Sequence, residues 1–179
     1  MQDVRRDDTP GGLVLAVLNT TPTVDGDRRE LLVGADGAAF IERWGGEGEG
    51  ARRALVSARD AVQEIVTTGA VATDLGDVLT GQVVQRPRLG PDGVAWELEA
   101  PSHAALAIRF LIEWTQLVAD HPGRLRRCAN PECSQFLLDR SNANARKWCS
   151  MSTCGNRMKA RRHHRRTAPQ GRDGSPSTH

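Results

Sequence analysis

The chain has 179 residues, of which 39% are hydrophobic and 26% charged, and its formal net charge is +2. This length suits one domain with a small module attached, or two small domains. The longest early apolar run, residues 13–18, is too short to span a membrane, and charged residues occupy position 3 and positions 5–8, where the apolar core of a signal peptide would begin. We therefore expect a cytoplasmic protein in a reducing compartment, with no membrane partner.

The first segments are a polar lead-in and a short apolar run. Residues 1–12 contain Pro10-Gly11-Gly12 and are expected to be flexible. Residues 13–18 are continuously apolar, and periodicity does not decide between a short strand and a buried helical turn. Asn19 and Thr20 follow this run, where they either line a pocket or turn the chain. Residues 22–36 are predicted to form a loop.

Three helices are predicted next. The first runs from near Asp36 to Trp44, and the second is an amphipathic helix over residues 51–68 that ends at Gly69. The third covers residues 72–83. Three arginines of the second helix alternate with acids and are expected on its solvated face: Arg52, Arg53 and Arg59.

A small β-hairpin is predicted between residues 86 and 98. The turn is formed by residues 90–93. Val94, Trp96 and Leu98 alternate with smaller or charged residues, which indicates a strand with one buried face and a hairpin that covers the core or a pocket. A long helix follows over residues 103–120, with Ser102 as its N-cap. Because this helix is apolar on most sides, we place it at the centre of its domain or at an oligomer interface.

All four cysteines lie near the C-terminal end of the chain, in two pairs with the same C-x4-C spacing. The list is Cys128, Cys133, Cys149 and Cys154. Four thiolates suit a single tetrahedral zinc ion, and a four-cysteine site has no open position, so it is structural. Two disulfides or four unrelated thiols are the alternatives. A reducing compartment and the equal spacing both favour zinc.

The charge of the chain is divided unevenly. Residues 124–166 hold twelve Lys/Arg and two acids, a net charge of +10, which leaves −8 for the rest of the chain. Such a basic segment indicates an anionic partner, above all nucleic acid. We expect no further metal ligands from His163 and His164, because four thiolates already close the site. His103 and His121 at the ends of the long helix are expected to be solvated or capping residues.

The residues around the cysteines resemble a known family. Phe136, Asp139 and Ser141 follow the first pair, residues 146–151 read RKWCSM, and residues 154–157 read CGNR before a basic run. This order resembles the CGNR zinc finger. The preceding body resembles, more weakly, the helical ABATE domain through LAVLNT at residues 15–20. The resemblance implies a bacterial DNA-binding transcription regulator.

The fold class we expect is mainly α with a small β-hairpin: a helical N-terminal domain followed by a treble-clef-like zinc finger. The domains are a lead-in (1–12), an ABATE-like domain (13–123), the finger (124–166) and a disordered tail (167–179). In the finger, residues 124–127 and 136–138 are predicted to be paired strands. Phe136 and Trp148 are predicted to form a small core of the finger, and Ser152 or Thr153 to cap a terminal helix.

The expected nucleic-acid contacts are the cations of the finger and its helix, most of them positioned against phosphates. They are Arg126, Arg127, Arg140, Arg146, Lys147, Arg157, Lys159, Arg161, Arg162, Arg165 and Arg166. The leading hypothesis is thus a zinc-dependent DNA-binding regulator whose body senses a small-molecule ligand or forms a homodimer. Docking of the finger on an acidic protein partner and binding to RNA are the alternatives. No phosphate-binding loop, nucleophile motif or open metal site points to an enzyme.

Overall fold

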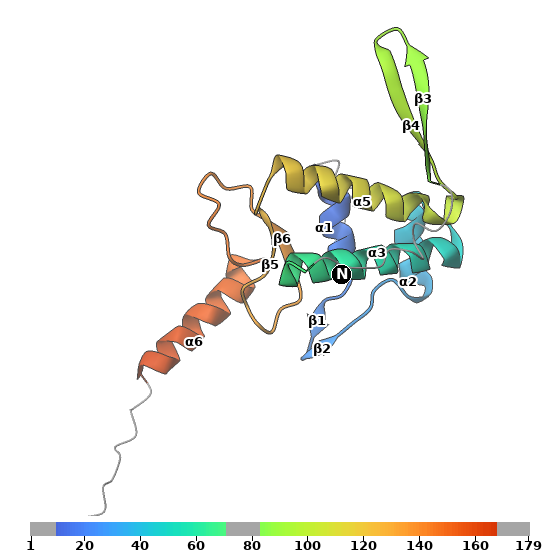
Figure 1. Ribbon diagram of the computed structural model, residues 1–179. Coiled ribbons are helices and arrows are strands. Elements are labelled where there is room, and N and C mark those ends of the chain that lie inside the picture. Colours follow the sequence, from blue (N-terminus) through green and yellow to red (C-terminus); the bar gives the residue numbers. More distant parts are fainter. Residues whose placement is uncertain (1–9, 71–82, 168–179) are drawn as a thin grey trace, which may run out of the picture.

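The computed structural model describes residues 10–70 and 83–167, and about half of these residues are helical (Figure 1). The helix predicted over residues 72–83 lies almost wholly outside these ranges, as do residues 1–9 and 168–179. In the described part, helices alternate with three separate antiparallel strand pairs. The expectation of a mainly helical chain with a small β-hairpin is confirmed, with two further strand pairs added.

The N-terminal body is built on three helices that contact one another pairwise. They are α1 (Gly12–Leu18), α3 (Gly48–Thr68) and α5 (Ser102–Asp120). The apolar run over residues 13–18 is therefore a buried helix, and Leu13, Val14, Val17 and Leu18 all lie in the core. Helix α2 (Gly34–Arg43) packs on α3.

The helix ends agree with the sequence pattern at some positions and differ at others. Helix α3 ends at Gly69, which adopts a left-handed conformation with φ of +72°, as a glycine at this position favours. Ser102 does not cap α5: the cap position is Pro101, which offers no side-chain acceptor, and Ser102 is the first helical residue. A short strand pair, β1 (Thr23–Val24) and β2 (Asp27–Arg28), lies within the loop predicted for residues 22–36.

Arg59 is buried, which corrects its predicted place on the solvated face of the second helix. Its side chain is 2% exposed, and its guanidinium donates to both carboxylate oxygens of Glu30 (2.9 and 2.7 Å) and to the hydroxyl of Thr20 (2.9 Å). Burial alone would lower the pKa of Arg59, but the bonds to Glu30 and the charge of Asp60 outweigh burial and raise it. The loop ahead of α2 thus supplies the carboxylate that permits a charge inside the body.

Strands β3 (Val84–Gly90) and β4 (Gly93–Glu99) form a hairpin that projects from the N-terminal end of α5 (Figure 1). The hairpin itself was predicted, but the buried face was wrong. Val94 and Trp96 are exposed, and every residue of β3 is exposed. The hairpin therefore does not cover the core, because it points away from the helices.

The C-terminal segment begins with β5 (Leu125–Arg127) and β6 (Phe136–Leu138), paired antiparallel in the predicted positions. Phe136 and Leu138 belong to the core cluster of the body, so Phe136 is not the centre of a separate finger core with Trp148. A π-helical turn (Met151–Gly155) leads into helix α6 (Asn156–Thr167), which extends from the body. The cap of this turn is Ser150, whose hydroxyl accepts from the amide of Thr153, and not Ser152 or Thr153.

Among the described residues, none of the helices combines the length and the apolar character needed to cross a lipid bilayer.

Candidate metal centre and basic helix

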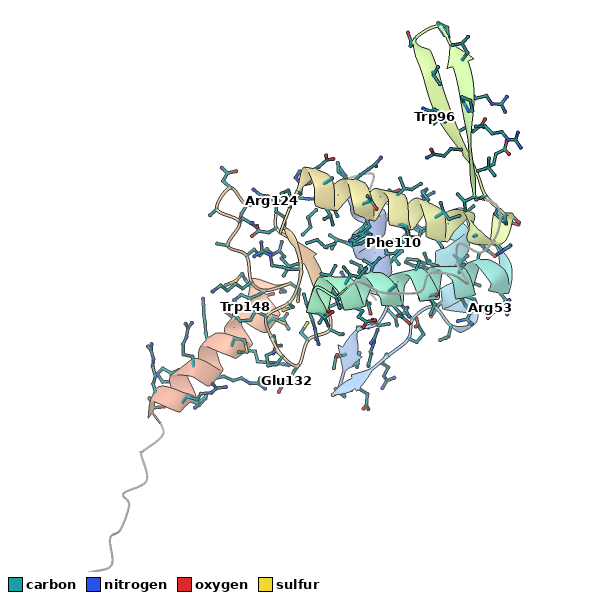
Figure 2. All side chains as sticks on the ribbon, viewed as in Figure 1. Arg53, Trp96, Phe110, Arg124, Glu132 and Trp148 are labelled. Atoms are coloured by element: carbon teal, nitrogen blue, oxygen red, sulfur yellow. The ribbon has the colours of Figure 1, made fainter. Side chains whose placement is uncertain are left out.

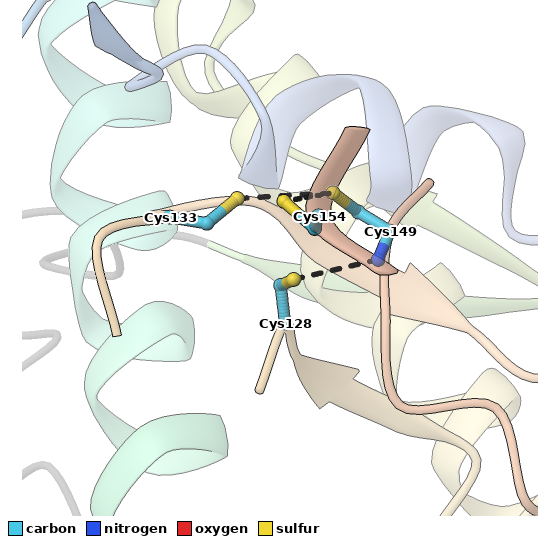
Figure 3. Close-up of side chains that lie close together, drawn as sticks. All are labelled: Cys128, Cys133, Cys149 and Cys154. Carbon is cyan, nitrogen blue, oxygen red and sulfur yellow. Dashed lines mark hydrogen bonds between the residues drawn. The ribbon is translucent and has the colours of Figure 1, made fainter. Parts of the chain in front are cut away.

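The four cysteines come together from four positions in the C-terminal segment. Cys128 follows β5, Cys133 lies in the loop before β6, Cys149 precedes the π-helical turn, and Cys154 lies within that turn. Their sulfur atoms all lie within 4.8 Å of one another (Figure 3). Backbone bonds hold this arrangement: the amide of Cys128 donates to Gln135 (2.8 Å), and the amide of Ala129 donates to Lys147 (2.8 Å), which joins the two cysteine pairs.

The spacing of the sulfurs fits one tetrahedral zinc ion. With Zn–S bonds of about 2.3 Å, neighbouring sulfurs of a tetrahedron lie about 3.8 Å apart. The Sγ atom of Cys149 is 3.7 Å from that of Cys133 and 3.7 Å from that of Cys154. A disulfide would need about 2.05 Å, and all four cysteines are free. The four cysteines can therefore hold one zinc ion.

Two N–H groups point at sulfur atoms of the cluster, as thiolate ligands require. The Cys149 amide donates to the Sγ atom of Cys128 (3.4 Å), and the side-chain amide of Asn130 donates to the Sγ atom of Cys154 (3.4 Å). Burial raises the pKa of Cys133 and of Cys149. Burial would also raise the pKa of Cys154, but the Asn130 amide and the neighbouring sulfurs lower it overall. Metal binding must displace the remaining thiol protons, so zinc affinity rises with pH.

Asp139 braces the loop between the two cysteine pairs from a fully buried position. Its carboxylate accepts from the amide of Ser141 (2.9 Å), the hydroxyl of Ser141 (2.6 Å) and the amide of Arg146 (2.7 Å). The Ser141 hydroxyl, the two amides and the nearby charge of Arg126 outweigh burial and lower the pKa of Asp139 to about 2. Sequence reasoning missed this role, although an aspartate two residues before a serine is a pattern typical of such turns.

Four of the predicted nucleic-acid contacts are bonded to the segment itself or to the chain near α1. Arg126 donates to the Gly123 carbonyl (2.8 Å) and to Asn144, and Arg146 donates to the carbonyls of Trp148 (3.0 Å) and Cys149 (2.5 Å). Arg140 donates to the carbonyl of Pro10 (2.9 Å), and Arg127 donates to the carbonyl of Cys133 (3.4 Å). These four guanidinium groups shape the segment, which limits what they can offer to a partner.

The cations of helix α6 lie on two different sides of the helix. Glu132, in the first cysteine loop, forms ion pairs with Arg157 (3.6 Å) and Arg161, which lie four residues apart. Lys159, Arg162 and Arg166 recur at i, i+3 and i+7 and so share another face. Within the described residues, these three cations, Lys147 and Arg165 are exposed and have no ion-pair partner.

Contacts far apart in the sequence attach the cysteine cluster to the body. The side chain of Asn19, at the end of α1, donates to the carbonyl of Phe136 (3.2 Å) and accepts from its amide (2.7 Å). Ser134, next to Cys133, donates to the carbonyl of Thr21 (2.7 Å) and accepts from the hydroxyl of Thr23 (3.0 Å). Asn19 is the C-cap of α1, which confirms its predicted role in turning the chain. Its bonds to β6 are a further structural role that sequence reasoning missed.

A groove of about 290 Å³ lies between α1, β6 and Cys149. Its lining includes Leu15, Asn19, Phe136, Arg140 and Arg146. Asn19 does reach a groove, as one of its two predicted roles requires. Thr20 instead is buried and bonds Arg59.

Comparison with known proteins concerns the C-terminal segment. No curated protein matches the chain. Residues 124–167 match the family model described as the CGNR zinc finger. The matched residues include all four cysteines shown in Figure 3, and Cys154 is the first residue of the tetrapeptide CGNR. The match covers 44 of the 179 residues, so the similarity to the CGNR zinc finger concerns the C-terminal segment and not the body.

Proposed function

We propose that the protein is a zinc-dependent DNA-binding transcription regulator, with α6 as the element that contacts DNA. The observation that carries this proposal is the face of α6 formed by Lys159, Arg162 and Arg166, which is exposed and without acidic partners in the described chain. Three cations spaced over two helical turns can contact successive phosphates. An α-helix also fits the major groove of B-DNA.

Zinc is required in this proposal because the metal site fixes the start of α6. Cys154 lies in the π-helical turn from which α6 continues, and no residue of α6 is buried. Like-charged side chains at i and i+4, such as Arg162 and Arg166, destabilise an isolated helix. Without the metal, α6 would lose its attachment to the rest of the finger. When DNA is bound, its phosphates would reduce the repulsion among the cations of α6.

The finger is proposed to adopt a treble-clef-like arrangement, with one cysteine pair on the β5–β6 hairpin and the other beside the helix. The acidic body, with its ABATE-like resemblance, is proposed to sense a ligand or to mediate assembly. Its tie to the finger through Asn19 and Phe136 supports this role, since a change at α1 reaches the strand that follows Cys133.

A second candidate function is docking of the basic finger on an acidic protein. The observation that favours it is the contact between Glu132 and the pair Arg157 and Arg161, in which a carboxylate already occupies one side of α6. The side formed by Lys159, Arg162 and Arg166 could accept acidic side chains of a partner in the same way.

The test compares the full-length, zinc-loaded protein with a triple variant, Lys159→Ala, Arg162→Ala and Arg166→Ala. The matched control removes three exposed arginines of the body, Arg29→Ala, Arg43→Ala and Arg53→Ala. Fluorescence anisotropy measures binding to duplex DNA, to structured RNA and to an acidic polypeptide. If three phosphate contacts are lost, the slope of log K against log salt becomes shallower by about 2.7.

We expect the control to bind duplex DNA as the wild-type protein does and the triple variant to bind it much more weakly. Equal DNA binding by the triple variant and the wild-type protein would overturn the assignment of α6. A clear preference for structured RNA or for the acidic polypeptide over duplex DNA would replace DNA with that partner.

A further inference from the structure

The groove beside the cysteine cluster lies where the body meets the finger. It is bounded by Leu15 and Asn19 of α1, by β6 and by Cys149, and its volume is about 290 Å³. Figure 2 shows the two parts that meet there, with Phe110 in the core of the body and Trp148, the neighbour of Cys149, in the finger. Ligand sites occur preferentially at such junctions, and their volumes begin at about 300 Å³. The groove is therefore large enough for a small molecule.

The charged side chains that line this groove, apart from the metal ligand Cys149, are both cationic. They are Arg140 and Arg146, and no aspartate or glutamate belongs to the lining. Neither guanidinium forms an ion pair with a carboxylate of residues 10–70 or 83–167. Two cations that share one groove without an acidic partner provide a site for an anion.

Both guanidinium groups are held in place and still have donors for a ligand. The Nη2 atom of Arg140 donates to the carbonyl of Pro10 (2.9 Å), and the Nε and Nη2 atoms of Arg146 donate to the carbonyls of Trp148 (3.0 Å) and Cys149 (2.5 Å). Within the described chain, Nε and Nη1 of Arg140 and Nη1 of Arg146 make no hydrogen bond. A guanidinium carries five N–H donors in a fixed fork that matches a carboxylate. Because these two groups are already oriented, they lose less freedom when a ligand binds.

The negative groups next to these arginines are already engaged. Asp139 precedes Arg140, but its buried carboxylate accepts three hydrogen bonds from the turn that follows it and lies 3.8 Å from the guanidinium of Arg126. In the zinc-loaded protein, the thiolate of Cys149 shares its charge with the metal ion. Neither group is available as a hydrogen-bonded partner for the two guanidiniums of the groove.

The rest of the lining favours a polar ligand over an apolar one. The three residues of β6 are each at most 6% exposed, so they offer little apolar surface for a ligand to cover. The groove has the volume of about ten water molecules, at about 30 Å³ each, which is more than an inorganic ion or acetate would fill. Two cations, little exposed apolar surface and this volume together match a short dicarboxylate that offers one carboxylate to each guanidinium.

We propose that this groove binds a short aliphatic dicarboxylate of about eight to ten non-hydrogen atoms, with one carboxylate on Arg140 and the other on Arg146. The ligand contacts Asn19, the C-cap of α1, and Cys149, a ligand of the metal, so it bridges the body and the finger. It is the ligand that the proposed function expects the protein to sense, and only this regulatory consequence rests on the proposed function. The binding itself is measured without DNA, so its failure and a failure of DNA binding are distinguishable.

The test is isothermal titration calorimetry of the full-length, zinc-loaded protein with succinate as the probe. We expect one succinate per chain with a Kd of about 1 mM or tighter. Arg140→Gln removes one charge-assisted contact and should raise this Kd at least about tenfold. The matched control is Arg127→Gln: Arg127 is also an exposed arginine of the finger with one bond to a backbone carbonyl (3.4 Å), but it does not line the groove. The control should leave the Kd unchanged.

A comparison of ligands tests the second guanidinium without any change to the protein. Succinamate has an amide in place of one carboxylate at nearly the same size, and it should bind at least about tenfold more weakly than succinate. Inorganic phosphate should bind more weakly because it does not fill the groove, and benzoate because it lacks a second charge. The zinc content should stay at one ion per chain throughout the titration, since the ligand binds to arginines and not to the metal.

Four results would overturn the proposal. The first is the absence of saturable binding at about ten times the expected Kd of succinate. The second is succinamate or phosphate binding as tightly as succinate, which would indicate a site for a single anion. The third is an equal Kd for Arg140→Gln and Arg127→Gln, and the fourth is a heat signal that accompanies loss of zinc. If Arg140→Gln fails to fold, the comparison of ligands on the wild-type protein still decides.

Discussion

The contact between Asn19 and β6 should be a main link between the body and the zinc finger. The side-chain amide of Asn19 makes two hydrogen bonds to the backbone of Phe136, 3.2 Å to its carbonyl and 2.7 Å from its amide. Phe136 is buried in the shared core. Asn19→Ala therefore removes two bonds and leaves a buried amide without its partner.

The magnitude follows from these two bonds. A buried amide left unsatisfied costs about 1–3 kcal/mol, and the second bond adds about 0.5–1.5 kcal/mol, so we expect a loss of about 2–3 kcal/mol in the free energy of unfolding. For a chain of this size, that corresponds to a decrease in Tm of roughly 4–10 °C. Zinc content should stay at one ion per chain, because the four sulfurs are untouched.

Differential scanning calorimetry of the zinc-loaded protein measures this effect. Asn142→Ala, on an exposed part of the finger, is the matched control and should melt with the wild-type protein. If Asn19→Ala melts within about 1 °C of the wild-type protein, the Asn19 bonds do not link the body to the finger, and the reasoning fails.

The remaining predictions concern three carboxylates. Glu30→Gln should destabilise the body by about 2–4 kcal/mol in urea unfolding, because it weakens the pairing of the buried Arg59; Glu64→Gln on the exposed side of α3 should be neutral. Asp139→Asn should lower Tm, and the difference from the wild-type protein should stay constant between pH 7 and pH 5. The pKa of Asp139 is lowered from 3.8 to about 2, so its contribution is complete above the unfolded value and decreases only as the pH falls from there through about 2. Glu132→Gln frees Arg157 and Arg161, so binding to duplex DNA should become tighter and its salt dependence steeper by up to about 1.8.

Each of these three predictions can be contradicted by a specific result. A Glu30→Gln variant as stable as Glu64→Gln would show that Arg59 does not need this partner. A Tm difference for Asp139→Asn that disappears already between pH 7 and pH 5 would contradict the lowered pKa. A Glu132→Gln variant that binds DNA less tightly would mean that Glu132 orients α6 for binding and does not compete with DNA.

Local patterns predicted much of this molecule. The C-x4-C pairs pointed to a four-sulfur cluster because each pair closes through a short loop, and α3 followed from the spacing of Leu55, Ala58 and Val62. The strand pair of the finger was predicted as well. These features depend on neighbours within a few residues, which a single sequence displays.

Long-range contacts explain the errors. Arg59 was placed in solvent because its partner Glu30 lies 29 residues earlier in an irregular loop. The core role of Phe136 depends on α1, and its bond to Asn19 spans 117 residues. In the hairpin, alternation identified the apolar face correctly but carried no information on what covers it, so the predicted burial of Val94 and Trp96 was wrong.

The most direct test of the central claim is the salt dependence of duplex DNA binding by the full-length protein, measured with zinc bound and again after chelation. With the three cations of the exposed α6 face on phosphates, affinity should fall roughly 40-fold between 50 and 200 mM salt, and more if Lys147 and Arg165 take part. Chelation should abolish the binding, because α6 then loses its anchor at Cys154. A zinc-loaded protein that fails to bind DNA even at low salt, or that binds equally well without zinc, would contradict the account.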